Sequence, residues 1–483
     1  MRQRERPWQR GRLGLGLCLI CMIFGLLLLA PPTLLQGQQP AFPAPAARKV
    51  TKPFPGIELL QLQYQKPRPL LVWMVRIDLE NPDVDFVVTP KSDVKRPAVT
   101  LSETTLAFAQ RMQVRLAINA SPFKPVAVLP GQPTQIEGLS LSMGDLYSPP
   151  QKDFGVLAID SQHRASIIAP PVQAEMLDGF CNGVGGFAML VDAGKNLHLG
   201  EDPQAPKHPR TAIGLSQDKH TMFWFVVDGR QPGKSEGLTQ RELADLGLQQ
   251  GCYQLLNMDG GGSSTLVMQN DNLTDWHVLN VPVGQRLPGS LRPNGNHLGL
   301  RVFLEKDSLT TAQLRAIMPR LTNPRARQFI GPLNDAMREF AINTPRRRAA
   351  FLAQLAHESG ELRYMEEIAS GEAYEGRKDL GNTETGDGVR FKGRGPIQLT
   401  GRANYRKAGR DLGLNLEGHP TLVANPCIGC RVAGWFWQQH QLNELADQGD
   451  FVAITRIING GLRGQTQREA YYQRARQVLH IDQ

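Results

Sequence analysis

Ala356-His357-Glu358-Ser359-Gly360 is the segment around which the C-terminal fold is organised, and Phe391-Lys392-Gly393-Arg394-Gly395-Pro396-Ile397-Gln398-Leu399-Thr400 completes it. The first segment ends an apolar run whose periodicity predicts a helix over 346–357. Ser359 and Gly360 favour the end of that helix, so Glu358 lies at a junction partly sheltered by the core. The second segment predicts a Gly-rich turn that leads into polar side chains. Together they indicate a cleft with an acid on one wall and hydrogen-bonding groups on the other.

Outward from this cleft, the chain divides into two regions of different secondary structure. Residues 57–305 contain short apolar runs broken by Gly, Pro, Asn and Asp, which predict strands, with few helices such as 239–247. From 308 to 483 the apolar positions recur at helical spacing. We therefore expect a multidomain protein, in which a strand-rich α+β domain over 57–305 precedes a mainly α domain over 308–483.

The N-terminus has the pattern of an export signal. Five arginines and one glutamate in residues 1–12 precede a nearly uninterrupted apolar run over 13–30. This run is long for a signal peptide and just long enough to span a membrane, so residues 1–30 are either a cleaved signal peptide or a membrane anchor. Residues 31–56, rich in Pro, Gln and Ala, predict a linker. Either alternative places the protein outside the cytoplasm, secreted or periplasmic, with membrane attachment through residues 13–30 in the second case.

Composition and motifs argue against several functions. The net charge of +9 is concentrated in part at the N-terminus, and no basic stripe alternates with aromatic residues, so we expect no nucleic-acid partner. His357 and Glu358 lack the second histidine of a zinc-protease motif. We expect neither a metal nor another cofactor.

The six cysteines are too few for a disulfide framework. Cys181 and Cys252 are far apart in sequence and able to pair if the protein is exported. Cys427 and Cys430 form a lone CxxC without further metal ligands. We interpret that pair as small buried residues or as a local disulfide on a helix.

A second carboxylate is required if Glu358 acts as the acid of a glycoside hydrolase, and the residues alone do not choose it. On one straight helix, Glu367 would lie roughly 13 Å along the axis from Glu358 and on the opposite face. The pair therefore works only if Gly360 breaks the helix and the chain folds back. An inverting reaction needs carboxyl groups roughly 6.5–9.5 Å apart. The candidates that follow in the sequence are Glu361, Glu366, Glu367, Glu372 and Glu375.

The C-terminal motifs, taken in order, resemble glycoside hydrolase family 19, the chitinase and phage-endolysin family with a lysozyme-like helical fold. The resemblance covers about 308–480 and rests on the segments 353–360, 374–383, 386–388, 393–405 and 457–462. It implies hydrolysis of a β-1,4 bond next to N-acetylglucosamine, with inversion and without a metal.

The resemblance also implies a role for each matching residue. Glu358 falls on the general acid and Glu367 on the general base, although the neighbouring glutamates leave Glu366 and Glu375 open as the base. Glu361 departs from the family pattern, because many relatives have a glycine there. The remaining matches are Thr400, which helps hold the attacking water, the sugar-binding positions Gln398, Asn404 and Asn459, and Arg468 at the position of the arginine that steadies the base.

In the N-terminal domain the most informative segment is Asn257-Met258-Asp259-Gly260-Gly261-Gly262-Ser263-Ser264-Thr265. Three successive glycines expose backbone amides, and this composition suits a cradle for a phosphate or a sugar oxygen. Arg210 and Arg230 follow or begin further strand-like runs, and arginine binds phosphate bidentately.

These segments, with 119–123 and 294–297, resemble the phosphodiester glycosidase family over about 70–305. The family is named for an enzyme that removes N-acetylglucosamine from phosphodiester-capped mannose. The resemblance implies a site lined by Asn119, Arg210, Asp228, Arg230, Asp259, Gly260, Gly261, Gly262, Ser263 and Ser264.

The leading hypothesis is an exported enzyme whose two hydrolase domains act on amino-sugar polymers. The C-terminal domain would cleave chitin-like or peptidoglycan glycan chains, and the N-terminal domain a sugar–phosphodiester link. One alternative is maturation of an exopolysaccharide or wall polymer by the N-terminal domain, with the helical domain as a glycan-binding anchor. A wall-binding protein without catalysis and a lytic transglycosylase are further alternatives. The absence of a Cys-dense chitin-binding module favours a bacterial wall role, but chitin and peptidoglycan both stay open.

Overall fold

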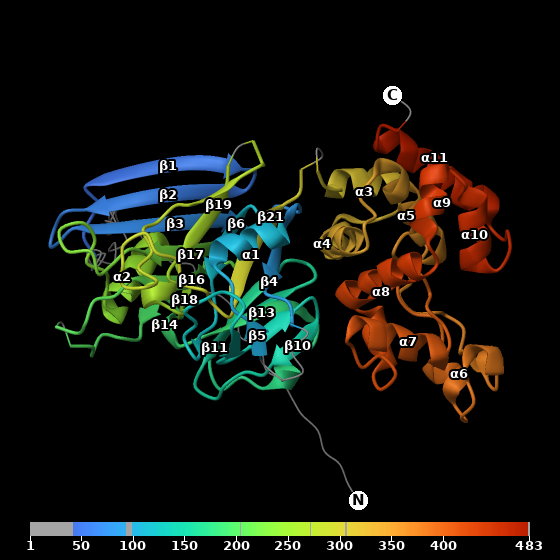
Figure 1. The fold of residues 1–483 in the computed structure, drawn as a ribbon, viewed down its shortest axis with the longest axis horizontal. Coiled ribbons are helices and arrows are strands. Elements are labelled where there is room, and N and C mark those ends of the chain that lie inside the picture. Colours follow the sequence, from blue (N-terminus) through green and yellow to red (C-terminus); the bar gives the residue numbers. More distant parts are fainter. Residues whose placement is uncertain (1–41, 93–98, 203, 271, 305–306, 482–483) are drawn as a thin grey trace, which may run out of the picture. The chain divides into compact units, whose positions relative to one another are not determined.

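The computed structural model describes residues 42–481 except 93–98, 203, 271 and 305–306. The predicted fold class is confirmed: strands dominate up to Val302, and helices dominate from Thr311 onward (Figure 1). The apolar run 13–30 and the start of the predicted linker lie outside the described residues. Among the described residues, no helix combines the length and the apolar character that a membrane crossing needs.

In the described residues the strands form four antiparallel sheets. The largest has eight strands in the order β1 (Ala47–Phe54), β2 (Ile57–Tyr64), β3 (Leu70–Asp78), β17 (Thr221–Val227), β16 (Arg210–Leu215), β18 (Gln254–Asn257), β14 (Ala188–Asp192) and β15 (Lys195–Asn196). A five-stranded sheet has the order β20 (Trp276–Val278), β19 (Leu266–Gln269), β6 (Leu116–Asn119), β21 (His297–Val302) and β4 (Val84–Val88). A second five-stranded sheet has the order β10 (Asp145–Ser148), β9 (Ser140–Ser142), β13 (Phe180–Gly186), β11 (Gly155–Asp160) and β12 (Ala165–Ile168). The smallest sheet contains β5 (Val99–Leu101), β8 (Pro133–Ile136) and β7 (Phe123–Lys124).

The predicted linker 31–56 is wrong at its C-terminal end, because residues 47–54 form β1 and pair with β2. β1 is an edge strand whose first six side chains are exposed. An exposed edge strand lacks the apolar alternation from which a strand is predicted, and its stability comes from the backbone hydrogen bonds to β2.

The core of the strand-rich part lies on both faces of the large sheet. One face packs its apolar side chains, including Val75 and Trp224, against strands of the five-stranded sheets. The other face packs against helix α2 (Gln240–Gln250) through residues such as Phe225 and Leu243. Thr239 and Glu242 form the predicted capping box of that helix. The second helix of this part is α1 (Thr105–Met112).

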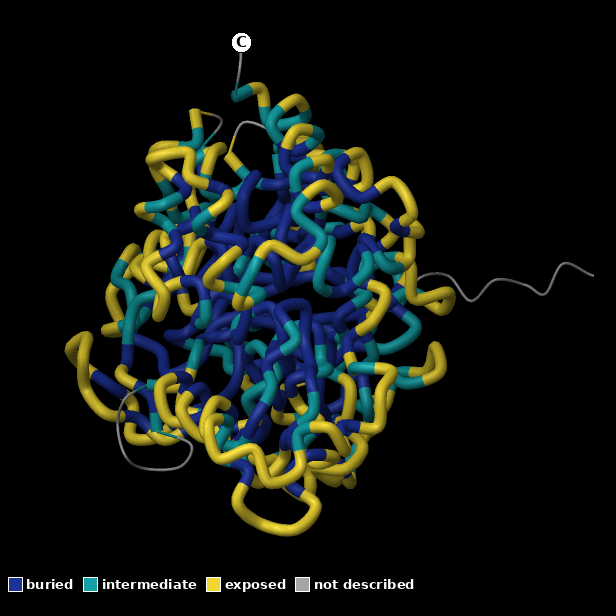
Figure 2. The backbone as a smooth tube through the Cα atoms, turned by 90° about the vertical axis from the view of Figure 1, so that its right-hand side faces the viewer, coloured by how far each residue is buried: buried dark blue, intermediate teal, exposed yellow. Residues whose placement is uncertain are grey.

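The C-terminal part is a helical unit with its own apolar core. Its helices are α3 (Thr311–Ile317), α4 (Asn323–Glu339), α5 (Pro345–Glu358), α6 (Asp387–Arg390), α7 (Arg402–Leu412), α8 (Pro426–Gln439), α9 (Leu442–Gln448), α10 (Phe451–Asn459) and α11 (Gln465–Val478). Short 3-10 turns at Glu372–Tyr374, Lys378–Leu380 and Pro420–Ala424 connect them. In Figure 2 the buried segments gather in the interior of the molecule, and the exposed segments lie mainly in loops at its periphery.

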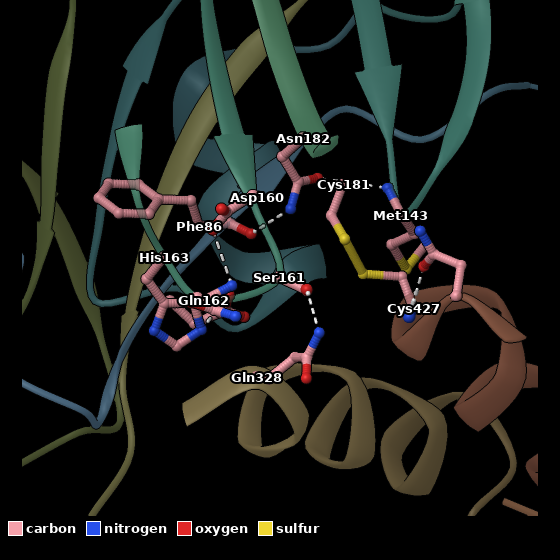
Figure 3. The surroundings of a disulfide bond; sticks show 12 residues. Phe86, Met143, Asp160, Ser161, Gln162, His163, Cys181, Asn182, Gln328 and Cys427 are labelled. Atoms are coloured by element: carbon pink, nitrogen blue, oxygen red, sulfur yellow. Dashed lines mark hydrogen bonds and ion pairs between the residues drawn. A yellow bond between two sulfur atoms is a disulfide. The ribbon is translucent and has the colours of Figure 1, made fainter. Parts of the chain in front are cut away.

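The disulfide joins the two parts of the chain and corrects the predicted pairing. Cys181 of β13 bonds to Cys427 of α8, and not to Cys252 (Figure 3). Cys252 and Cys430 are buried free thiols. Cys252 lies in the apolar core under α2, which separates it from Cys181 at the end of a different sheet.

Polar contacts accompany the disulfide. The Gln328 amide donates to Ser161 Oγ at 3.3 Å (Figure 3). The Thr311 amide at the start of α3 donates to Asp83 at 2.8 Å. The helical part is therefore tied to the strand-rich part by covalent and polar contacts at several points.

Two candidate active sites

The helix that carries Glu358 ends directly after it, in a turn of left-handed backbone. α5 ends at Glu358, and Ser359 closes it by donating its hydroxyl to the Leu355 carbonyl at 2.5 Å. The next three residues, 360–362, have φ angles of 58°, 65° and 61°. Such left-handed backbone is unfavourable for Glu361, and the buried Glu361 carboxylate compensates by accepting from Arg320 at 2.9 Å.

Glu358 is held by a buried arginine. Arg468 of α11 donates to Glu358 at 2.5 Å and to Gln354 Oε1 at 2.5 Å, and Gln354 in turn donates to Thr455 at 2.9 Å. The Arg468 side chain is 1% exposed, whereas that of Glu358 is 18% exposed and so reaches the surface. This contact differs from the one that the family resemblance implies, since Arg468 contacts the expected acid and not the expected base.

Glu367 lies among the polar groups of the 391–400 segment. Its carboxylate accepts from the Tyr374 hydroxyl at 3.0 Å and from the Gly393 amide at 3.1 Å. A Cβ atom at Gly393 would lie 2.9 Å from Gln398 Oε1, 3.2 Å from Glu367 Oε2 and 3.4 Å from Thr400 Oγ1. These three side chains therefore converge on a position where only a glycine leaves them room.

The two alternative bases are engaged elsewhere. Glu366 forms ion pairs with Lys392 at 2.9 Å and with Arg394 at 3.4 Å. Burial raises the pKa of Glu366, but the hydrogen bonds and charges of those two cations outweigh it and hold the pKa below its usual value. Glu375 accepts from the amides of Gly386 and Gly388 at 2.7 and 2.8 Å, which ties two loops together.

The other predicted sugar-binding residues lie on neighbouring elements. Gln398 has a φ of 56°, and its amide donates to the Gly395 carbonyl at 3.0 Å. Asn404 of α7 donates to the Thr400 carbonyl at 2.8 Å. Asn459 is the last residue of α10, and among the residues described here its side chain has no hydrogen bond to the rest of the site. Tyr374 lies in a segment that carries the family resemblance. Its contact with Glu367, however, could not be predicted from the sequence.

The N-terminal candidate site is built around the end of β18. The chain leaves β18 through Asp259 and enters the glycine loop 260–262. Asn119 of β6, which is 1% exposed, donates to the Asp259 carbonyl at 2.6 Å. Its side-chain oxygen accepts from the Thr211 hydroxyl at 2.9 Å and from the Thr265 amide at 3.1 Å. Asn119 therefore positions the loop and is itself shielded from solvent.

Two aspartates of this site have raised pKa values. Burial raises the pKa of Asp259 to about 6, against the opposing effects of a hydrogen bond from Ser263 and the charge of Arg292. Burial also raises the pKa of Asp228 to about 6, although Asn280 and the Val281 amide donate to it at 3.0 Å. Asp228 is 2% exposed, and its carboxylate holds the segment at Asn280 and Val281 in place. Asp259 is half-buried at the glycine loop.

Arginines surround the glycine loop. A Cβ atom at Gly262 would lie 2.3 Å from Arg292 Nη2, and one at Gly261 would lie 3.1 Å from Arg230 Nη2. Arg230 also contacts His208 at 3.3 Å, and Arg210 is held by the Leu238 carbonyl at 2.9 Å. The loop residues are glycines because two guanidinium groups pack directly on their backbone.

Two residues of this site were not predicted from the sequence. Arg292 and His208 were not predicted, although Arg292 lies two residues before the 294–297 motif and His208 two residues before Arg210. Arg292 donates to Ser263 Oγ at 3.3 Å. The predicted Ser264 is 1% exposed, and its hydroxyl is buried without a hydrogen-bond partner among the described residues.

Comparisons with known proteins agree with both resemblances. Residues 112–301 match the family model described as phosphodiester glycosidase, and residues 341–449 match the model described as chitinase class I. A glycosyl hydrolase family 19 domain-containing protein of Haemophilus influenzae is 30% identical over 156 residues, which cover 26% of this chain and 76% of that protein.

Two further comparisons cover parts of the chain. An endochitinase of Arabidopsis thaliana is 45% identical over 114 residues, 23% of this chain and 38% of its own, so the chain spans less than half of that relative. The solved catalytic domain of zebrafish N-acetylglucosamine-1-phosphodiester alpha-N-acetylglucosaminidase has 15% identity and a TM-score of 0.39, with 53% of this chain and 88% of that one covered. The chain thus belongs to glycoside hydrolase family 19 through its C-terminal domain, and residues 112–301 before that domain match the phosphodiester glycosidase model.

Proposed function

We propose that the C-terminal domain hydrolyses β-1,4 bonds of N-acetylglucosamine polymers, either chitin-like chains or peptidoglycan, with inversion. The observation that carries this proposal is the environment of Glu367. Its carboxylate is oriented by Tyr374 and Gly393 at the position where Gln398 and Thr400 converge. Glu358 lies at the end of α5, directly before the left-handed turn at 360–362.

In this mechanism Glu358 protonates the glycosidic oxygen as the bond to the anomeric carbon breaks. Glu367 removes a proton from a water molecule that attacks the opposite face of the sugar, and Thr400 holds that water. Arg468 acts as a positioning residue, because it binds Oε1 of Glu358 and so directs the other carboxyl oxygen away from itself. Glu366, engaged by Lys392 and Arg394, is less suited to the role of base.

Zymography on chitin and on peptidoglycan tests this proposal. We expect clearing by the wild type and loss of clearing by Glu358→Gln, which keeps the shape of the side chain and removes its proton donor. Equal clearing by the variant would contradict the assignment. Clearing on one substrate alone identifies the polymer, and reducing-end products without anhydro ends separate hydrolysis from lytic transglycosylation.

We further propose that the N-terminal domain cleaves a sugar 1-phosphodiester. Arg230 and Arg292 at the glycine loop would stabilise the charge of the departing phosphate, since guanidinium groups bind phosphate bidentately. A phosphate monoester is already a good leaving group, so the residue most needed is a base for water. Asp259, with its pKa near 6, is suited to that role at neutral pH.

The test is the release of N-acetylglucosamine from its 1-(methyl phosphate) diester by the full chain. Asp259→Asn is expected to abolish the release, whereas Glu358→Gln is expected to leave it unchanged. If Glu358→Gln abolished the release, or Asp259→Asn did not, the assignment of Asp259 would fail.

We also propose that the protein works in a secreted or periplasmic compartment, with residues 13–30 as a cleaved signal or an anchor. The Cys181–Cys427 disulfide supports this proposal, because such bonds persist in oxidising compartments. Fractionation of cells with an antibody against the chain, with and without carbonate extraction, tests both the compartment and the attachment.

A further inference from the structure

A pocket of about 670 Å³ lies outside both candidate sites. It is lined by the end of strand β21, by the C-terminal half of α4, by Arg348 of α5 and by residues near positions 115 and 269. No residue predicted for either hydrolase site lines it. Its walls come from both the strand-rich part and the helical part of the chain.

The lining is rich in positive charge. Four arginines, Arg115, Arg301, Arg338 and Arg348, line the pocket together with a single carboxylate, Asp307. Asp307 is already engaged, because it accepts a hydrogen bond from Arg115. Arg301 pairs with two carboxylates, those of Asp85 and Asp335. Both of them line a separate small cavity and not this pocket. The surface of the larger pocket therefore carries more cations than anions.

Arg348 is the least satisfied of these cations. It has no carboxylate partner within ion-pair distance among the described residues, and its single hydrogen bond goes to the Asp307 carbonyl at 3.3 Å. Its Nε is buried and has no acceptor in the part of the chain that the structure describes. Burial lowers the pKa of this guanidinium. Asp307 is the carboxylate whose charge acts on Arg348, but it is already bonded to Arg115, so a further anion in the pocket would be stabilising.

Arg338 lies on the same wall and keeps donors free. It gives one hydrogen bond, to Asp335 at 3.1 Å, and its side chain is 37% exposed. Met337 and Ile342 add apolar surface beside it. A pocket of this size accommodates an organic molecule and not merely an inorganic ion.

We propose that this pocket binds a small organic phosphate of the size of a sugar phosphate. Its phosphate would be held by Arg338 and Arg348, and its organic part would lie against Met337 and Ile342. Because residues from both parts of the chain line the pocket, the ligand binds the native arrangement and stabilises it. This site is independent of the two hydrolase activities proposed above.

The test is isothermal titration calorimetry on the full chain with glucose 6-phosphate, inorganic phosphate and glucose as probes. We expect glucose 6-phosphate to bind, inorganic phosphate to bind more weakly, and glucose not to bind. Arg348→Gln and Arg338→Gln are each expected to weaken binding at least tenfold, whereas Arg348→Lys retains measurable binding. Glucose 6-phosphate should also raise the temperature of unfolding of the wild type and not that of Arg348→Gln.

Two matched controls decide where the phosphate binds. Arg48→Gln removes an exposed arginine of β1 and should leave the affinity unchanged. Arg292→Gln removes an arginine of the N-terminal site and shows whether the measured binding occurs there instead. Loss of binding in Arg292→Gln alone would place the phosphate at the glycosidase site and overturn the proposal. Absence of binding to the wild type, or equal binding by all variants, would also overturn it. Circular dichroism of each variant without ligand excludes a folding defect.

Discussion

Arg468 donates to the Glu358 carboxylate at 2.5 Å from a side chain that is itself 1% exposed. The buried guanidinium of Arg468, in the helical core, thus holds the carboxylate of Glu358, the expected acid of the cleft. The arrangement gives Glu358 one orientation, and it links that orientation to the packing of α11 against α5.

The first prediction concerns this pair. Arg468→Lys keeps the charge but loses the forked geometry that reaches Glu358 and Gln354 together. We expect kcat on N-acetylglucosamine oligomers to fall about tenfold to a hundredfold with little change in KM, and the free energy of unfolding to fall by about 1–3 kcal/mol. Steady-state kinetics and urea denaturation measure the two effects. Arg410→Lys, at an exposed position of α7, serves as the control. A change in KM alone would argue for a sugar-binding role instead.

The second prediction concerns the orientation of Glu367. Tyr374→Phe removes the hydroxyl that donates to its carboxylate at 3.0 Å. A hydrogen bond to a charged group contributes about 1.5–3 kcal/mol, so we expect kcat to fall tenfold or more. Tyr471→Phe is the matched control, because its hydroxyl donates to Glu361 and not to the cleft. Unchanged kcat in Tyr374→Phe would show that Glu367 needs no such support.

The third prediction tests the space at Gly393. Gly393→Ala places a Cβ atom 2.9 Å from Gln398 Oε1 and 3.2 Å from Glu367 Oε2. We expect at least a tenfold loss of kcat/KM while the unfolding temperature changes little, because side chains at the surface of the cleft can move aside. Gly200→Ala, where a Cβ meets no atom within 4 Å, should be neutral in both measurements. Full activity of Gly393→Ala would mean that the three polar groups do not act together.

The fourth prediction is a pH dependence of stability. Asp228 has a folded-state pKa of about 6, above its unfolded value. The folded state therefore holds the proton more tightly, and this contribution to stability is complete below about pH 4 and is lost as the pH rises through 6. The loss amounts to about 2–3 kcal/mol. Urea denaturation of the wild type at several pH values should show this decrease in the free energy of unfolding.

Asp228→Asn is the comparison for this effect, since its side chain does not titrate. The difference in unfolding free energy between wild type and variant should change with pH between about 4 and 6, in favour of the variant at the higher pH. A constant difference across that range would contradict the assignment of the titration to Asp228.

The fifth prediction concerns the disulfide. Cys427→Ser opens a link between residues 246 positions apart, and loop-closure arguments give a loss of roughly 5–6 kcal/mol. Urea denaturation of oxidised protein measures the loss, and mass spectrometry of peptides identifies the bond. Cys430→Ser, on the same helix, should preserve the cross-linked peptide. Detection of a Cys181–Cys252 peptide would contradict the structure.

The elements that could be predicted from the sequence are those with a local physical cause. The capping pair Thr239–Glu242 and the apolar face of α5 depend on residues within one or two turns, so their pattern is visible in the chain. The edge strand β1 was missed because its exposed side chains carry no apolar alternation. The cysteine pairing was missed because sequence separation does not say which side chains the core will separate.

The sequence by itself determined the two-part organisation, the glutamate at the end of α5 and the glycine loop, because each rests on periodicity, capping or a run of small residues. Only the tertiary structure decided which glutamate faces Gln398 and Thr400, which carboxylate Arg468 contacts, and that Arg292 packs on Gly262. These relationships join residues that are distant in the chain, and they are set by the packing of whole helices and sheets. Three glutamates that look equivalent in sequence differ in the structure because each meets a different set of charges and amides there.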